Sequence, residues 1–188
     1  MQHGVAKLIA ADGEVEESGY TAVHVKHDGK WLLDRVTESD DPVVQTHYEQ
    51  LKELEWMVGT WIDEDDSGRI ETTCKWTKNK NFITRSFSVT IDDRVDSSGM
   101  QLIGWDPAAK QIRSWVFDSN GGFAEGRWTK KENRWYISTT GTLPDGGSAS
   151  FVNIIKIVDE NQFKWQSVNR TIDGNLQPNI DEVIVVRD

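Results

Sequence analysis

The chain has 188 residues, of which 37% are hydrophobic and 28% are charged, a composition typical of a globular protein rather than a disordered one. Its 31 acidic residues outnumber 21 Lys and Arg residues, which gives a net charge of -10. An acidic surface repels nucleic-acid phosphates and anionic lipids, so we expect neither nucleic acid nor membrane among its partners.

Two further features of the sequence restrict its class. No apolar run approaches the roughly 18 residues that would span a bilayer, and the N-terminal segment does not read as a signal peptide. We therefore expect a cytoplasmic protein. The single cysteine, Cys74, excludes an intramolecular disulfide and a cysteine-rich zinc site.

Residues 1–38 predict a three-stranded antiparallel β-meander, with turns at Asp12-Gly13 and Asp28-Gly29. A sheet this small cannot cover its own apolar face, which we expect to carry Val23, Val25 and Leu32. That face should pack on the rest of the protein or on a second copy, and a homodimer through the meander is the natural solution.

Residues 39–46 read as an acidic and polar linker with one proline. Residues 47–58 predict one short helix, because Leu51, Leu54 and Val58 share a face at i, i+3 and i+7 spacing. Gly59 supplies the helix stop.

The remainder of the chain predicts ten strands joined by short, turn-rich connections. No helix lies between them, which excludes a parallel arrangement and favours an antiparallel meander that closes on itself. The fold class is therefore mainly β, with residues 47–188 forming a ten-stranded antiparallel barrel. The predicted strands are residues 59–64, 69–78, 81–92, 99–106, 111–118, 122–130, 134–142, 147–158, 162–171 and 179–187.

Residues 48–188 resemble the lipocalin-like barrel domains, which include nitrobindin-like and fatty-acid-binding-like proteins. The resemblance rests on LKELEWMVGTW, Leu51 to Trp61, and on MQLIGWDPAAKQIRSWVFDSNGGFAEGRW, Met100 to Trp128. It covers about three quarters of the chain and implies a barrel behind a short N-terminal helix.

Residues 14–38 (EVEESGYTAVHVKHDGKWLLDRVTE) resemble the last strands of SnoaL-like, ketosteroid-isomerase-like domains. Residues 1–38 would then be the C-terminal remnant of such a domain. The N-terminal helices and the acidic residue that acts as base in the isomerases have no counterpart here, so the resemblance does not imply isomerase activity.

Candidates for catalysis and metal binding are few. Nitrobindin-like barrels hold haem through a histidine late in the chain, and residues 48–188 contain no histidine, so we expect no cofactor. We also predict no metal site, because His24 and His27 would point to opposite faces of a strand. Within the barrel, only Glu125 and Glu182 are plausible catalytic carboxylates. We nevertheless predict no catalytic residue.

Aromatic residues are the strongest signal. Seven of the nine tryptophans lie in the predicted barrel strands, together with six phenylalanines. An interior lined with rings suits a flat or aliphatic ligand. Plain filling of a solid barrel remains the alternative.

Polar residues in phase with apolar ones indicate where a ligand would be held. Arg85 alternates in phase with Ile83 and Phe87, and a buried guanidinium needs either an internal partner such as Glu125 or an anionic ligand. The predicted ligand-binding residues are Trp76, Arg85, Phe87, Trp115, Glu125, Asn153, Trp165 and Asn169.

These observations favour a protein that binds a small hydrophobic or amphipathic ligand, with or without a carboxylate, inside the barrel. Two alternatives stay open: an enzyme of the isomerase or cyclase type, and a non-catalytic scaffold with a solid barrel.

Overall fold

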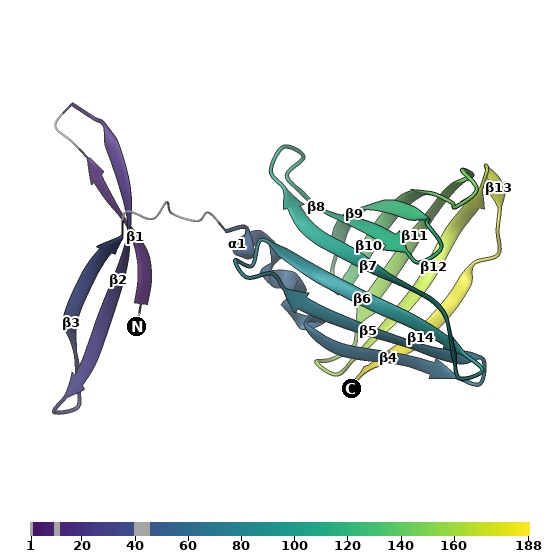
Figure 1. Ribbon diagram of the computed structural model, residues 1–188, viewed down its shortest axis with the longest axis horizontal. Helices are drawn as coiled ribbons and strands as arrows, with labels where there is room; N and C mark the ends of the chain where they lie inside the picture. The colour runs from purple at the N-terminus through teal and green to yellow at the C-terminus, as the bar shows by residue number, and fades with distance from the viewer. Residues whose placement is uncertain (1, 10–11, 40–45) are drawn as a thin grey trace. The chain divides into compact units, whose positions relative to one another are not determined.

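A computed structural model describes residues 2–9, 12–39 and 46–188 (Figure 1). The chain divides into two compact units, Met1–Gln45 and Thr46–Asp188. Most of the predicted linker, residues 40–45, lies outside the described residues, as do residues 10 and 11 at the end of the first predicted strand.

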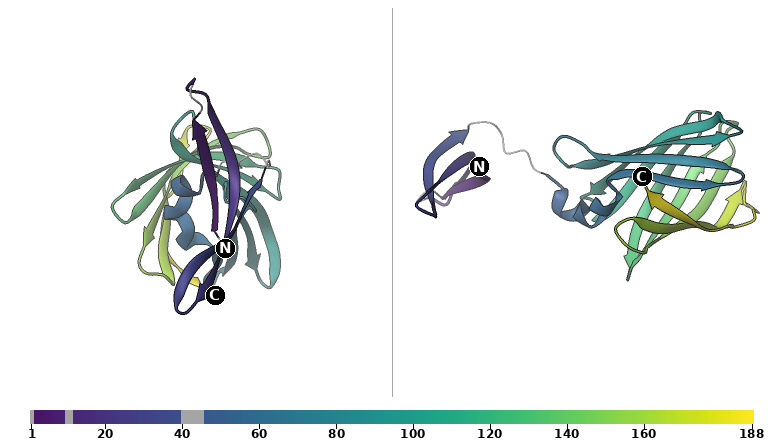
Figure 2. Two further views of the ribbon diagram at one scale, coloured as in Figure 1. Left: turned by 90° about the vertical axis from the view of Figure 1, so that its left-hand side faces the viewer. Right: turned by 90° about the horizontal axis from the view of Figure 1, so that it is seen from below.

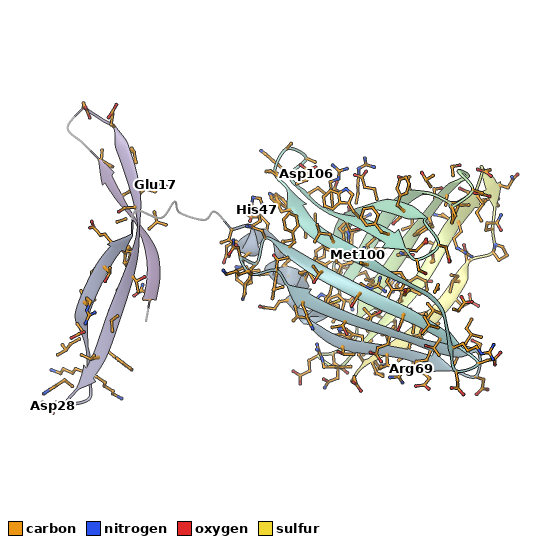
Figure 3. All side chains as sticks on the ribbon, in the orientation of Figure 1. Glu17, Asp28, His47, Arg69, Met100 and Asp106 are labelled. Atoms are coloured by element: carbon orange, nitrogen blue, oxygen red, sulfur yellow. The ribbon has the colours of Figure 1, made fainter. Side chains whose placement is uncertain are left out.

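The first unit is a three-stranded antiparallel sheet in the order β1-β2-β3, as predicted. Its strands are β1 (Gln2–Ile9), β2 (Val15–His27) and β3 (Lys30–Ser39). The turn between β2 and β3 places Asp28, labelled in Figure 3, and Gly29 at positive φ, which matches the twist of a two-residue hairpin.

This sheet exposes apolar side chains. Val25 and Leu32, paired across β2 and β3, are 44% and 51% exposed. Trp31 and Leu33 lie on the opposite face, and a β-bulge in β3 brings Val36 onto that face as well. These three side chains are 68%, 57% and 51% exposed. Neither face of the sheet is therefore covered within the unit.

The second unit begins with a helix in two parts. A single α-helical turn, α1 (Tyr48–Leu51), continues as the 3-10 helix η1 (Lys52–Met57). Leu51, Leu54 and Met57 are all buried, and their spacing of three residues aligns them on one face of a helix with three residues per turn. The sequence predicted an α-helix with Val58 on this face, but Val58 is extended.

Ten antiparallel strands then close into a barrel, as predicted. Starting at β11, the ring runs β11-β10-β9-β8-β7-β6-β5-β4-β14-β12, and a pairing between β12 and β11 closes it. The two-residue strand β13 (Asn175–Leu176) only adds to β12. The barrel strands are β4 (Gly59–Asp65), β5 (Gly68–Trp76), β6 (Phe82–Ile91), β7 (Arg94–Asp106), β8 (Gln111–Asp118), β9 (Phe123–Lys131), β10 (Arg134–Thr142), β11 (Ser148–Ile157), β12 (Gln162–Ile172) and β14 (Ile180–Arg187).

The two ends of the barrel differ. The short helix lies at one end, which we call the helix end (Figures 1 and 2). Buried apolar side chains fill that end in one cluster that includes Leu51, Leu54, Ile83, Ile103 and Trp135. We call the opposite end, where β4 leads into β5, the mouth. Any internal space must therefore lie between the apolar plug and the mouth.

Arg187 fastens the helix end to the last strand. Its guanidinium lies 4.2 Å from the centre of the Trp61 ring and donates hydrogen bonds of 2.9 Å to the carbonyls of Trp56 and Val58. Gly59 has a φ of +133°, and a Cβ at this position would overlap Nη1 of Arg187. The Gly59-Thr60-Trp61 sequence thus leaves room for Arg187, which connects the first and last segments of the barrel domain at the helix end.

Among the described residues, no helix combines the length and the apolar character needed to cross a bilayer.

Candidate functional site

The barrel holds an internal cavity of about 260 Å³. That is several times the ~30 Å³ that one water occupies in the liquid, and close to the ~300 Å³ at which pockets for drug-sized ligands begin. Its wall is mostly apolar and rich in rings. The aromatic residues that line it are Trp56, Trp61, Phe87, Trp128, Phe151, Phe163 and Trp165.

Arg85 lies in the wall of this cavity, as the alternation of β6 predicted. Its Nη2 lies 3.3 Å from the hydroxyl oxygen of Thr72, and its Nη1 lies 3.5 Å from the amide oxygen of Gln101. Both contacts are long and both partners are uncharged. No carboxylate of the described residues forms an ion pair with Arg85, because the ion pairs found there all involve other cations.

The surroundings of Arg85 make its charge costly. Burial lowers the pKa of the Arg85 guanidinium, yet an arginine remains protonated at neutral pH. The guanidinium lies 5.0 Å from the centre of the Phe87 ring, which offers only a weak cation–π contact. The cavity therefore contains a positive charge that forms no ion pair with any carboxylate of the described residues.

The wall beside Arg85 is rich in hydrogen-bond donors. Ser114 is 1% exposed, and its oxygen accepts a 3.0 Å hydrogen bond from Nε1 of Trp128, so its own hydroxyl hydrogen can be donated into the cavity. The Gln101 side-chain amide and the Thr72 hydroxyl also line this wall. Several donors around one cation form an environment that favours an anion.

Cys74 pairs with Arg85 across β5 and β6 and also lines the cavity. The side chain is 2% exposed, as expected for a small buried hydrophobe. Burial raises the pKa of the Cys74 thiol to about 11, although the nearby Arg85 opposes this shift. At neutral pH the thiol stays protonated, so it is not a competent nucleophile.

Asn153 lies in the opposite wall. It projects from β11 into the cavity, and its Oδ1 is buried without a hydrogen-bond partner among the described residues. Four strands separate β6 from β11 in either direction round the ring: β7, β8, β9 and β10 one way, and β5, β4, β14 and β12 the other. Arg85 and Asn153 therefore face each other across the lumen.

Asp63 is the one carboxylate of the described residues that lines the cavity. It lies two residues before the mouth end of β4. Partial burial raises the pKa of the Asp63 carboxyl, and the nearby Asp65 adds to the shift. Asp63, the first residue of the acidic segment 63–66, thus lines the cavity.

The structure brings four of the eight predicted ligand-binding residues together in the cavity wall, namely Arg85, Phe87, Asn153 and Trp165. The other four lie elsewhere. Trp76 packs against the apolar plug and contacts the ring of Tyr48, with ring centres 5.5 Å apart. Asn169 is exposed, and its backbone N–H donates to Oδ1 of Asn179.

Trp115 and Glu125 belong to the outer wall. On β8 the residues that face inward are Ile112, Ser114 and Val116, which places Trp115 outside. Glu125 forms an ion pair there with Arg113, and the guanidinium of Arg113 lies 5.6 Å from the centre of the Trp115 ring. The internal Arg85–Glu125 pair considered from the sequence is therefore not formed.

Sequence reasoning missed the neutral polar residues of the wall. Thr72, Gln101 and Ser114 are all buried. The available signal was a polar residue in phase with apolar ones, such as Ser114 between Ile112 and Val116.

Nowhere in the described ranges do three or more His, Cys, Asp or Glu side chains form a group that could hold a metal ion. No protein-family model matches the chain, and no curated protein matches it. The SnoaL-like and nitrobindin-like resemblances thus rest on sequence motifs alone, whereas a closed barrel with a small helix is consistent with a lipocalin-like barrel.

Proposed function

We propose that this protein binds a small amphipathic carboxylate inside its barrel. The observation that carries the proposal is the Arg85 guanidinium, which lies in an apolar cavity with only two long contacts to neutral oxygens. A carboxylate accepts two parallel hydrogen bonds from a guanidinium and neutralises it. A ligand of this kind would offset the cost of burying Arg85.

The rest of the cavity favours a compact apolar body for this ligand. Trp56, Trp61 and Phe163 form an aromatic cluster with ring centres 4.9 to 6.0 Å apart, and all three line the cavity. Flat or aliphatic groups pack well against such rings. The volume of about 260 Å³ favours one ring or a short chain.

An isomerase or cyclase is supported less well. Glu125 lies outside the barrel with Arg113, and Glu182 pairs with Lys164 at 2.6 Å, so neither carboxylate suggested by the sequence reaches the cavity. Asp63 alone brings a carboxyl to it. A solid scaffold is also less well supported, because the barrel is not filled.

The proposal is tested by calorimetric titration with 3-phenylpropanoate and with its uncharged amide. We expect the carboxylate to bind at least about tenfold more tightly, since a charge-assisted hydrogen bond contributes ~1.5–3 kcal/mol. Arg85→Leu should remove this preference. Arg127→Leu, which deletes the same group from an exposed position, should retain it. Equal binding of acid and amide, or an unchanged preference in Arg85→Leu, would overturn the proposal.

A further inference from the structure

The second polar feature of the cavity is the Asn153 side chain. Its Oδ1 is buried and has no hydrogen-bond partner among the described residues. Asn153 pairs with Ile137 on one side and with Ser167 on the other, so its backbone is fixed within the sheet while its side chain lines the cavity. A buried polar atom of this kind is stable only when water or a ligand satisfies it.

An unhydroxylated acid in the cavity would not satisfy this atom. In the empty barrel, water can bind the Asn153 amide because the cavity is large enough to hold it. A ligand that displaces this water with an apolar group loses those hydrogen bonds and therefore loses affinity. The wall opposite Arg85 thus selects for a ligand that carries a polar group of its own.

We propose that the ligand is a hydroxy acid, with its carboxylate at Arg85 and its hydroxyl at Asn153. A hydroxyl fits this position because it can both donate and accept, so it satisfies either end of an asparagine amide. The carboxylate and the hydroxyl belong at opposite ends of the ligand, because β6 and β11 lie on opposite sides of the ring. This inference rests on the proposed function, since it presupposes a carboxylate at Arg85.

The wall at Arg85 and the wall at Asn153 differ in charge, and this difference fixes the orientation of the ligand. Arg85 and the Thr72 hydroxyl and Gln101 amide beside it have N–H and O–H groups left to donate, and so receive the carboxylate. Asn153 presents an unpaired acceptor and a neutral amide, and so offers a carboxylate no positive charge. A reversed ligand would leave the guanidinium without its counter-charge.

The test compares pairs of acids that differ only in a terminal hydroxyl. The first pair is 3-phenylpropanoate and 3-(4-hydroxyphenyl)propanoate. A second set pairs hexanoate, octanoate and decanoate with their terminal hydroxy acids, so that the distance between the two polar ends is varied. We expect at least one hydroxy acid to bind about fivefold or more tightly than its parent in calorimetry, from the cost of leaving one buried acceptor unpaired.

Asn153→Leu should reduce this hydroxyl preference to less than about twofold, because leucine has no hydrogen-bonding group. Ser138→Leu, an exposed position on the neighbouring strand, is the matched control and should keep the preference. A further test changes the ligand and uses the wild-type protein. 3-(4-Methoxyphenyl)propanoate lacks the hydroxyl hydrogen, so it should not bind more tightly than 3-phenylpropanoate.

The outcomes separate the two proposals. If the acids bind through Arg85 but no hydroxy acid is preferred at any length, the hydroxy-acid inference is wrong and the carboxylate site stands. A preference that persists unchanged in Asn153→Leu would also overturn the inference. If no acid binds, or if Arg85→Leu binds every acid as tightly as the wild-type protein does, both proposals fail.

Discussion

Arg85 and Asn153 show what strand alternation predicts at single residues. On β6, Ile83 and Phe87 flank Arg85 on one face, and on β11 Phe151 and Ile155 flank Asn153 in the same way. Large apolar residues mark the inward face of both strands. Because side chains alternate along a strand, the polar residue between two of them must also point inward.

On β8 and β9 the same reasoning placed side chains on the wrong side of the wall. Phe117 and Phe123 pair across these strands and are 52% and 53% exposed. One inward-facing pair on these strands, Ser114 and Gly126, carries smaller groups. Phe117 also pairs with Met100, labelled in Figure 3, which is 54% exposed. Ring size does not identify the inner face where the outer wall carries rings too.

The stability of the empty protein gives a prediction about Arg85. Replacing a buried charge by an apolar side chain of similar bulk is often stabilising, even where the charge was paired. We therefore expect Arg85→Leu to raise the free energy of unfolding by about 1 kcal/mol or more, measured by urea denaturation without ligand. Arg127→Leu on the outer wall should change it by less than about 0.5 kcal/mol. A marked loss of stability in Arg85→Leu would mean that the guanidinium has a structural role.

Among the elements, the strands were predicted more closely than the helix. All ten barrel strands lie near their predicted bounds because each is limited by turn residues. The main difference is β7, which begins at Arg94 rather than residue 99. Asp92 and Asp93 both adopt positive φ and make a two-residue hairpin that lets β7 start earlier.

The connection between η1 and β14 was not predictable from sequence, because it joins residues more than 120 apart. Arg187 donates to Trp56, Val58 and also to the Glu160 carbonyl at 2.9 Å. Local patterns carry no information about such a contact.

The Arg187 contacts predict a large effect of mutation. Arg187→Ala removes three hydrogen bonds and the stacking on Trp61, and we expect a loss of about 2–4 kcal/mol in the free energy of unfolding. Arg127→Ala is the control, with an expected change below about 0.5 kcal/mol. Chemical denaturation of both variants provides the measurement. An equal effect of the two substitutions would show that Arg187 does not secure the helix end.

At the scale of the whole molecule, the sheet of β1, β2 and β3 poses a separate question. Its fold was predicted from turn signals and alternation, and the homodimer expected through its apolar residues stays a prediction. Trp31, Leu33 and Val36 form an exposed stripe along β3. We propose that a second copy of the chain covers this stripe, since an isologous contact needs only one self-complementary patch.

The dimer proposal is tested by light scattering coupled to gel filtration. We expect a mass of twice the 21.4 kDa of one chain. Trp31→Glu and Leu33→Lys should each yield the single-chain mass, because a charge in an apolar contact is costly. Met100→Glu, at an exposed apolar position of the barrel, should leave the dimer intact. A monomeric wild-type protein would contradict the proposal.

The central claim is that the barrel interior holds a carboxylate against Arg85. An experimental structure of the protein with 3-phenylpropanoate tests it most directly. We expect the ligand inside the barrel, with its carboxylate oxygens within ~2.7–2.9 Å of the Arg85 guanidinium nitrogens and its ring against Trp61 or Phe163. A ligand bound on the outer wall, or a carboxylate turned away from Arg85, would contradict the claim.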